Sequence, residues 1–284
     1  MSQILFDEID RLFELAPEEL GAGARGVFEE LLGGLESGVL RAARPTQGED
    51  GGLRWEVQPS VKRGILLGFR LGANEVMAPA GPLEFRDKNT YPPQQLPLAA
   101  RNIRIVPGGS SVRRGAYLGQ NVTMMPPAYV NVGAYIGDGT MVDSHALVGS
   151  CAQIGQNVHL SAGAQIGGVL EPIGQAPVIV EDNVLVGGNT GLYEGVRVCE
   201  GAVIAAGCVI TGGTPIFDLV HEKVYRGSAD APLVIPPRAV VIPGSRPAHG
   251  DFAQRNGLQM SALIIVKYRD AKTDRSTALE QALR

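Results

Sequence analysis

The chain has 284 residues, of which 44% are hydrophobic and 19% charged, so it can bury a substantial core and is not intrinsically disordered. Its formal net charge of −4 excludes a general electrostatic attraction to nucleic acids or to anionic membranes. Thirty-eight glycines with only 5% aromatic residues are typical of a thin, repetitive core rather than of a conventional globular one.

The first hundred residues predict an α/β cap domain, which we assign to residues 1–102. Apolar residues at helical spacing predict two or three helices within residues 1–42. A Gly- and Pro-containing break over residues 45–52 precedes an extended segment at residues 55–57 and a strand predicted over residues 64–71. Residues 79–97 contain five prolines and are predicted to form a loop. We expect this domain to close one open end of the repeat that follows, which would otherwise expose unpaired strand edges.

From residue 106 to residue 210 the chain repeats a unit of six residues. The first position of each unit is aliphatic, and the position four residues later is usually small. A period of six fits neither a helix nor a simple hairpin and is typical of a β-helix, in which three units make one 18-residue rung. Stacked rungs bury a continuous column of side chains that one rung could not hide alone. The repeated residues are Val106, Val112, Leu118, Met124, Val130, Ile136, Val142, Val148, Ile154, Leu160 and Ile166 and, after a two-residue slip, Val180, Val186, Leu192, Val198, Ile204 and Ile210.

Two segments interrupt the repeat, and a third region follows it. Residues 167–177 and 217–233 are predicted to leave the column as loops. Ile235 and Val241 are again six residues apart and predict a last partial rung, so the β-helix is assigned to residues 103–242. The C-terminal segment, residues 243–284, predicts a strand over residues 260–267 and a short helix over residues 273–284.

Outward corner residues 18 apart should stack into edges along the column. One predicted edge consists of Met125, Asp143, Ser161 and, after the slip, Glu181 and Cys199. A second, almost bare edge consists of Asn131, Gly149, Gly167, Gly187 and Ala205. A bare edge would let an extended ligand bond to main-chain groups, and a carboxylate facing it could accept a proton from an amine. The alternative is that Asp143 only caps a turn by accepting hydrogen bonds from nearby backbone.

The cysteines and histidines do not predict a metal site. Cys151, Cys199 and Cys208 form no CxxC pair and are predicted to be small buried residues. His145 and His159 are fourteen residues apart, which is not a multiple of six, so a three-histidine zinc site is not expected. The acidic N-terminus and the lack of an 18-residue apolar stretch predict a soluble, cytoplasmic protein.

Four stretches of the sequence carry a resemblance to a known family. They are MVDSHALVGSCAQIGQNVHLSAGAQIGGVLEP (residues 141–172), RIVPGGSSVRRGAYLG (104–119), VKRGILLGFRLG (61–72) and LIIVKYRDAKT (263–273). In this order they resemble tetrahydrodipicolinate N-succinyltransferases, hexapeptide-repeat acyltransferases of the diaminopimelate route to lysine. The resemblance implies a mainly β fold built on a left-handed parallel β-helix. It also implies a homotrimer with active sites between neighbouring subunits.

The same resemblance implies roles for individual residues. Asp143, in the MVD motif, is the expected catalytic base and also a substrate contact. Arg104, in the R-x-V-P motif, is expected to hold the dicarboxylate substrate. The expected lining of the acyl-CoA groove is the chain near Ser161, Gly188, Ala205 and Ala206. Relatives of one branch have a glutamate where Gly191 stands, and Glu194 is either its replacement or a solvated turn residue.

The predicted reaction transfers a succinyl group from succinyl-CoA to the amino group of ring-opened tetrahydrodipicolinate, giving N-succinyl-2-amino-6-oxopimelate. Succinyl-CoA is a co-substrate, and no tightly bound cofactor, metal, nucleic acid or membrane partner is expected. Arg238, Arg246 and Lys267 are candidates for contacts with the CoA phosphates. One alternative is an acetyltransferase with the same acceptor, because the two donors differ by a few pocket contacts. The other is a non-catalytic trimeric scaffold, which would not bind CoA.

Overall fold

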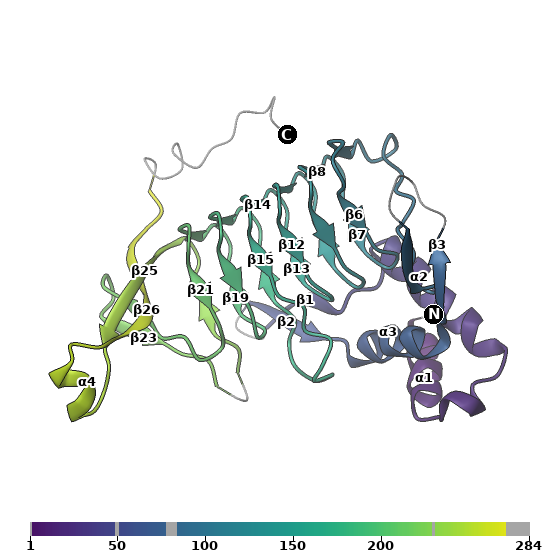
Figure 1. Cartoon of the computed structure of the whole chain (residues 1–284), viewed down its shortest axis with the longest axis horizontal. Coiled ribbons are helices and arrows are strands. Elements are labelled where there is room, and N and C mark those ends of the chain that lie inside the picture. Colours follow the sequence, from purple (N-terminus) through teal and green to yellow (C-terminus); the bar gives the residue numbers. More distant parts are fainter. Residues whose placement is uncertain (1, 49–50, 78–83, 229–230, 271–284) are drawn as a thin grey trace.

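The computed structural model describes residues 2–48, 51–77, 84–228 and 231–270 and has the predicted repeat at its centre. Two-residue strands stack into three parallel sheets, which we call faces 1, 2 and 3 (Figure 1). Face 1 contains β5 (Arg104–Ile105), β8 (Thr123–Met124), β11 (Met141–Val142), β14 (His159–Leu160), β17 (Leu185–Val186) and β20 (Val203–Ile204). Face 2 contains β6 (Ser111–Val112), β9 (Tyr129–Val130), β12 (Leu147–Val148), β15 (Gln165–Ile166), β18 (Gly191–Leu192) and β21 (Val209–Ile210). Face 3 contains β7 (Tyr117–Leu118), β10 (Tyr135–Ile136), β13 (Gln153–Ile154), β16 (Ile179–Val180), β19 (Arg197–Val198) and β24 (Val234–Ile235).

The second residue of almost every strand points into the column and is buried, as the six-residue period predicts. From Val112 to Ile210 each predicted aliphatic position is at most 5% exposed, and the small residues between them, such as Ala134 and Ala152, are buried with them. Each fully buried aliphatic side chain stabilises the fold by about 1.5–3 kcal/mol relative to an exposed one. The fold is therefore the left-handed parallel β-helix that the sequence and its resemblance predicted.

The first rung departs from the prediction by one residue. Ile105, and not Val106, is in register with Met124, and Val106 is only half-buried. Ile105 and Val112 are seven residues apart, and the extra residue is accommodated by a turn in which Gly108 and Gly109 have positive φ. Such φ values cost little only without a Cβ.

The loop at residues 167–177 leaves the column as predicted, but the register across it corrects the two predicted edges. Leu160 pairs with Val186, and Ile166 with Leu192, in each case 26 residues later. Gly187 and Ala205 therefore stack on Ser161 and belong to the edge of Asp143. Glu181 and Cys199 instead follow face 3. The prediction was wrong because it lengthened the 18-residue step by two residues across the loop. The loop lengthens the step by eight residues, that is, by one further six-residue unit.

The helices of the N-terminal domain are α1 (Ser2–Phe13), the short 3₁₀ helix η1 (Pro17–Glu19), α2 (Gly23–Glu36) and α3 (Pro59–Leu71). The strand predicted over residues 64–71 is wrong, since this segment belongs to α3. Pro59 starts that helix, and its buried residues Val61, Ile65 and Gly68 follow helical spacing. Gly64 and Gly68 let the α3 backbone approach Leu31 of α2, Phe28 and Tyr91 closely.

The domain lies along the side of the β-helix rather than across its end (Figure 1). Val132 and Cys151, from the corner between faces 2 and 3, are buried in the same cluster as the helices. The hairpin of β1 (Ala43–Gln47) and β2 (Leu53–Val57) continues over face 3, where Trp55 Nε1 donates to Glu181 Oε1 at 3.0 Å. The expectation of a cap over the open end is therefore wrong for the helices. Leu96 and Ile103 pack against the first rungs of the column instead.

A second small hairpin lies within the segment predicted as a loop. β3 (Asn74–Met77) pairs antiparallel with β4 (Phe85–Lys88), so the prediction of loop over residues 79–97 is wrong for β4. These strands are short and mostly exposed, and they give no apolar alternation that the sequence could reveal.

The C-terminal region extends face 1. Residues 217–233 were predicted as a loop, but they contain most of a hairpin of β22 (Ile216–Asp218) and β23 (Lys223–Tyr225). Ile235 and Val241 are both buried, as the predicted partial rung requires. β25 (Ala239–Pro247), α4 (Asp251–Arg255) and β26 (Gln259–Tyr268) form an arm that projects beyond the column (Figure 1). The strand predicted over residues 260–267 is confirmed as β26, and the predicted helix over residues 273–284 lies outside the described residues.

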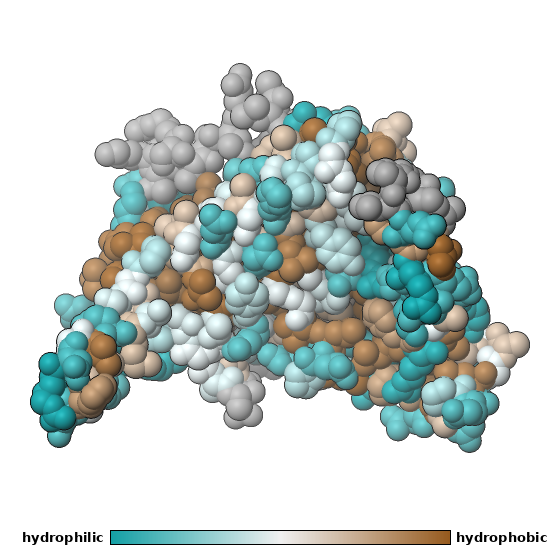
Figure 2. All heavy atoms as spheres, in the orientation of Figure 1, coloured by the Kyte–Doolittle hydropathy of each residue, from teal (hydrophilic) through white to brown (hydrophobic). Residues whose placement is uncertain are grey.

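The surface mixes hydrophilic and hydrophobic residues, with apolar side chains also on the C-terminal arm (Figure 2). On that arm Phe252, Leu258 and Met260 are 46–69% exposed. Among the described helices, none is long and apolar enough to cross a membrane.

Candidate functional site

The corner between faces 1 and 2, which we call the acid corner, brings together most of the predicted site residues. Its first positions, from rung to rung, are Met125, Asp143, Ser161, Gly187 and Ala205. Backbone hydrogen bonds fix this order: Asp143 N donates to Leu160 O, Ser161 N to Val186 O, and Gly187 N to Ile204 O, at 2.7–2.9 Å. One carboxylate and a run of small residues thus share a single corner. The prediction had placed them on two different edges.

The Asp143 carboxylate both caps its turn and faces an imidazole. Its Oδ1 accepts a hydrogen bond from Ser144 N at 2.7 Å, as the turn-capping alternative proposed. Its Oδ2 lies 3.6 Å from His159 Nε2, and the Asp143 side chain is 30% exposed. A half-exposed carboxylate with one oxygen held by the backbone has a fixed direction and a second oxygen available for proton transfer.

Sequence reasoning missed His159 as a neighbour of Asp143. It considered this residue only as a metal ligand. The signal was present, because His159 is 18 residues after Met141 and the two are in register on β11 and β14. The His159 ring therefore lies on face 1 directly beside the corner, and its side chain is 16% exposed.

The acid corner also presents main-chain groups along its length. Its second positions are Ser144, Ala162, Gly188 and Ala206. Their carbonyl groups bind the next rung, since Asn189 N donates to Ala162 O at 3.0 Å and Gly207 N to Gly188 O at 2.9 Å. Within the described residues the amide N–H groups of Ala162, Gly188 and Ala206 donate no hydrogen bond. A row of such N–H groups can donate to the carbonyl oxygens of an extended ligand.

Arg104 lies on face 1, two strands before Asp143. It is the first residue of β5, in register with Thr123 of β8, which pairs with Met141 of β11. Two strand spacings correspond to about 10 Å along the column. The Arg104 residue is exposed, and it lies outside the corner itself.

Glu194 does not belong to the acid corner. It lies at the corner between faces 2 and 3, with φ of 55°, and its Oε2 accepts a hydrogen bond from Gly212 N at 3.0 Å. Of the two interpretations left open for Glu194, this position matches the turn residue. The space beside Gly191 is filled by another side chain, because a Cβ on Gly191 would lie 2.4 Å from Cε2 of Tyr193.

The three candidates for phosphate contacts are spread over the C-terminal end. Arg238 Nη2 donates to Arg269 O, and Lys267 Nζ lies 3.7 Å from Asp270 Oδ1. Arg246 lies farther along β25, on the part of the arm that continues past the acid corner. Its Nη1 lies 3.1 Å from His249 Nε2, and its buried Nε has no acceptor among the described residues.

A second polar cluster lies at the end of β22. Asp218 Oδ2 accepts from Tyr268 Oη at 2.7 Å and lies 2.9 Å from His221 Nδ1, while its Oδ1 accepts from two backbone amides. Burial alone would raise the pKa of Asp218, but these hydrogen bonds together lower it to about 2. The carboxylate thus joins the hairpin to β26.

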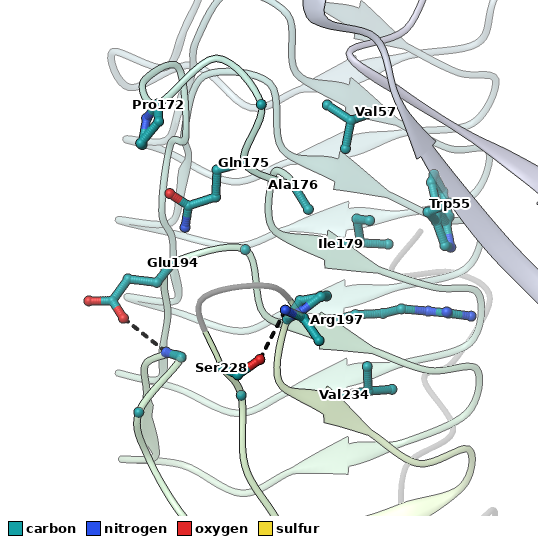
Figure 3. A pocket seen from close by; sticks show the side chains of 17 residues that line it. Trp55, Val57, Pro172, Gln175, Ala176, Ile179, Glu194, Arg197, Ser228 and Val234 are labelled. Carbon is teal, nitrogen blue, oxygen red and sulfur yellow. Dashed lines mark hydrogen bonds between the residues drawn. The ribbon is translucent and has the colours of Figure 1, made fainter.

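A large cavity lies away from the acid corner, on face 3. It has a volume of about 1000 Å³ and is bounded by the β1–β2 hairpin, the loop at residues 172–176 and the segment near Ser228 (Figure 3). Trp55 and Arg197 line one side, but the Arg197 guanidinium is already paired with Glu181 Oε1 at 2.7 Å. Of the predicted candidates only Glu194 lines it, and Figure 3 shows its carboxylate turned toward the backbone of the next rung.

The three thiols are buried, as the sequence predicted. Burial raises the pKa of Cys151 to about 12 and the pKa values of Cys199 and Cys208 to about 11. They are therefore protonated at neutral pH and are not nucleophiles. Within the described part of the chain no group of three or more His, Cys, Asp or Glu residues is arranged to hold a metal ion.

Comparison with known proteins gives full-length relatives. The family described as "Tetrahydrodipicolinate N-succinyltransferase N-terminal" matches residues 5–71, and "Hexapeptide repeat of succinyl-transferase" matches residues 177–212. The chain is 40% identical over 290 residues to the 2,3,4,5-tetrahydropyridine-2,6-dicarboxylate N-succinyltransferase of Azoarcus sp. (strain BH72), covering 100% of this chain and 98% of that protein. It is 43% identical over 276 residues to the enzyme of the same name from Polynucleobacter asymbioticus, covering 95% and 93% of the two chains.

Among solved structures, a putative 2,3,4,5-tetrahydropyridine-2-carboxylate N-succinyltransferase from Campylobacter jejuni is similar with a TM-score of 0.39 and 16% identity. The match covers 83% of this chain and 62% of that one.

Proposed function

Because this chain belongs to the tetrahydrodipicolinate N-succinyltransferase family, we propose that it transfers a succinyl group from succinyl-CoA to the amino group of ring-opened tetrahydrodipicolinate. The open form arises when one water adds to the cyclic imine and frees its nitrogen as an amine. The product is N-succinyl-2-amino-6-oxopimelate, an intermediate on the diaminopimelate route to lysine. The observation that supports this most strongly is the acid corner, where the Asp143 carboxylate shares one edge with the bare backbone at Gly188 and Ala206.

In this proposal Asp143 accepts the proton of the attacking amine. Its Oδ1 is held by Ser144 N, so Oδ2 is the oxygen that takes the proton, beside His159 Nε2. The amine nitrogen attacks the thioester carbon, the carbonyl oxygen becomes an oxyanion, and the N–H groups of the corner that donate no other hydrogen bond stabilise it. The carbon–sulfur bond then breaks and CoA leaves as a thiolate, so the step requires no covalent enzyme nucleophile.

Substrate binding follows from the order of residues along the column. Arg104, about 10 Å before Asp143, would hold a carboxylate of the acceptor in a charge-assisted hydrogen bond. The pantetheine arm of CoA would lie along Ser161, Gly188, Ala205 and Ala206 on the other side of Asp143. The arm would then lead toward Arg246, because β25 continues from the rung that follows Ala205. Among the three phosphate candidates we therefore favour Arg246.

A homotrimer completes the proposed site. One subunit offers the acid corner as a convex edge, and its large cavity lies on face 3 instead. A second wall must come from elsewhere, and a neighbouring subunit is the simplest source. Exposed apolar residues on face 2, Tyr129 and Val209, support a packing surface there. Static light scattering should give a trimer. A cytoplasmic location, predicted from the sequence, remains part of the proposal.

The deciding experiment compares donors. The purified protein is incubated with tetrahydrodipicolinate and either succinyl-CoA or acetyl-CoA, and release of the CoA thiol is followed together with the mass of the product. Turnover with succinyl-CoA that requires the acceptor supports the proposal. Turnover with acetyl-CoA alone would reassign the donor, and the absence of both turnover and CoA binding would favour a scaffold.

A further inference from the structure

Tyr193 is folded back over the one outward position of face 2 that has no side chain. Gly191 is the first residue of β18, and the corresponding residues of the neighbouring strands are Gln165 and Val209. A Cβ on Gly191 would lie 2.4 Å from Cε2 and 2.9 Å from the hydroxyl oxygen of Tyr193. A Cβ on Gly167, one rung earlier, would lie 2.8 Å from Cδ1 of the same ring. Two glycines thus make room for this ring.

The direction of the strand places the Tyr193 hydroxyl on the side of face 2 that is nearer the acid corner. β18 starts where the acid corner ends, at Asn189 and Thr190, and Tyr193 follows its last residue. Because the ring extends backward from residue 193 to residue 191, its hydroxyl points toward the corner and not away from it. The hydroxyl therefore lies in the rung of Gly188, two rungs beyond Asp143.

The hydroxyl is available for a ligand. Within the described residues the Tyr193 hydroxyl has no hydrogen-bond partner, and the residue is half-buried. A phenol is an O–H donor on a rigid apolar ring, and its strongest acceptors are anionic oxygens. The neighbouring Gln165 side chain is already engaged, because its Nε2 donates to His145 O and Gly163 O, both at 3.3 Å.

We propose that Tyr193 is a specificity-determining residue for the acyl donor, and that its hydroxyl donates a hydrogen bond to the distal carboxylate of the succinyl group. The inference rests on the proposed function. In that function Arg104 and Asp143 bind the acceptor toward the first rungs of the column, and Gly188 and Ala206 hold the donor farther along it. Tyr193 lies in the donor's half. An acetyl group has no distal carboxylate, so it would leave the hydroxyl without an acceptor.

The test is Tyr193→Phe in the full-length chain, which removes the hydroxyl and keeps the ring over Gly191. A hydrogen bond to a charged group accounts for about a ten- to hundredfold difference, so kcat/KM for succinyl-CoA should fall by that factor. The inhibition constant of free CoA, which has no acyl group, should stay unchanged. Tyr135→Phe is the matched control, because Tyr135 stacks on Tyr117 on face 3, at a centroid distance of 4.6 Å, and should change neither quantity.

A second variant moves the hydroxyl instead of removing it. Gly191→Ala places a Cβ 2.4 Å from a ring carbon, so the ring must shift, and the same loss confined to succinyl-CoA is expected. An unchanged kcat/KM for succinyl-CoA in Tyr193→Phe would overturn the inference. An equal loss of affinity for free CoA in Tyr193→Phe would also overturn the inference, because it would show that the hydroxyl acts through packing and not through the acyl group. If the unaltered protein turns over succinyl-CoA, these outcomes leave the proposed function intact. If it does not, the proposed function and the inference fail together.

Discussion

Gly188→Val tests whether the acid corner is the surface on which the donor lies. The same corner position is occupied by Ser144, Ala162 and Ala206 in other rungs, so its backbone conformation accepts a Cβ. A Cβ at Gly188 would meet only Ala162 O, at 3.2 Å, which requires a shift of a few tenths of an ångström. The fold should therefore tolerate the change, with a free energy of unfolding within about 1 kcal/mol of the unaltered protein.

The effect on the donor should be larger. The valine methyl groups project from the corner into the path assigned to the pantetheine arm. Overfilling a packed contact costs about 1–3 kcal/mol, which corresponds to a rise in the dissociation constant of CoA of about 5- to 150-fold. Gly188→Ala, with a single methyl group, should give a smaller rise. Isothermal titration with CoA measures the affinity, and thermal denaturation measures the stability of each variant.

Gly213→Val is the matched control. A Cβ at Gly213 meets nothing within 4 Å, and Gly213 lies near the cavity on face 3 rather than on the acid corner. Its CoA affinity should equal that of the unaltered protein. An unchanged CoA affinity in Gly188→Val would refute the assignment of the donor groove, and an equal loss in Gly213→Val would place the donor at the face 3 cavity instead.

Three further predictions concern the base, a buried network and pH. Asp143→Asn should lower kcat by about 10²–10⁴-fold with the oligomer intact, and near-normal turnover would exclude Asp143 as the base. Glu181→Ala should lower the free energy of unfolding by about 3–5 kcal/mol in urea titrations, because the 6%-exposed carboxylate binds Trp55, Arg197 and Glu200 N. The control is Glu56→Ala, which breaks an exposed ion pair with Arg44 and should lower the free energy of unfolding by less than about 1 kcal/mol. The folded pKa of Asp218 is depressed to about 2, so its stabilisation of about 2 kcal/mol is present above pH 4 and is lost as the pH falls toward 2. Asp218→Asn should therefore show a smaller loss of stability than the unaltered protein between pH 6 and pH 3, and an identical loss would contradict this.

The column could be predicted from the sequence because its physical cause is local and periodic. Each inward position must be aliphatic and each corner must be small, so the burial of a residue such as Ile154 or Ala152 can be predicted from its type and its place in the repeat. The N-terminal domain has no such redundancy. The run from Gly64 to Leu71 contains enough apolar residues for a strand, and its helical state becomes clear only together with Pro59 at the helix start and its packing on Leu31 and Phe28. The side-on position of the domain depends on pairs distant in sequence, such as Trp55 and Glu181, which no local pattern reveals.

The candidate site was predictable residue by residue but not as a geometry. The motifs identified Asp143 and Arg104, while the edge assignment separated Asp143 from Gly187 and Ala205. His159 was missed although its 18-residue distance from Met141 placed it beside the corner. Tyr193 was missed because its ring folds back over Gly191, and six-residue spacing contains no information about the direction of a side chain.

The loop at residues 167–177 explains why the acid and the bare backbone meet on one corner. The strands on both sides of the loop are joined by the same hydrogen-bond ladder as every other rung, with Leu160 on Val186 and Ile154 on Val180. The loop adds eight residues to the 18-residue step, so its residues leave the column without rotating the next rung. If the loop instead shifted the register by one corner, Gly188 and Ala206 would lie on another edge than Asp143, and donor and base could not face one amine. Register in the ladder, and not the length of the loop, therefore keeps the two halves of the site aligned.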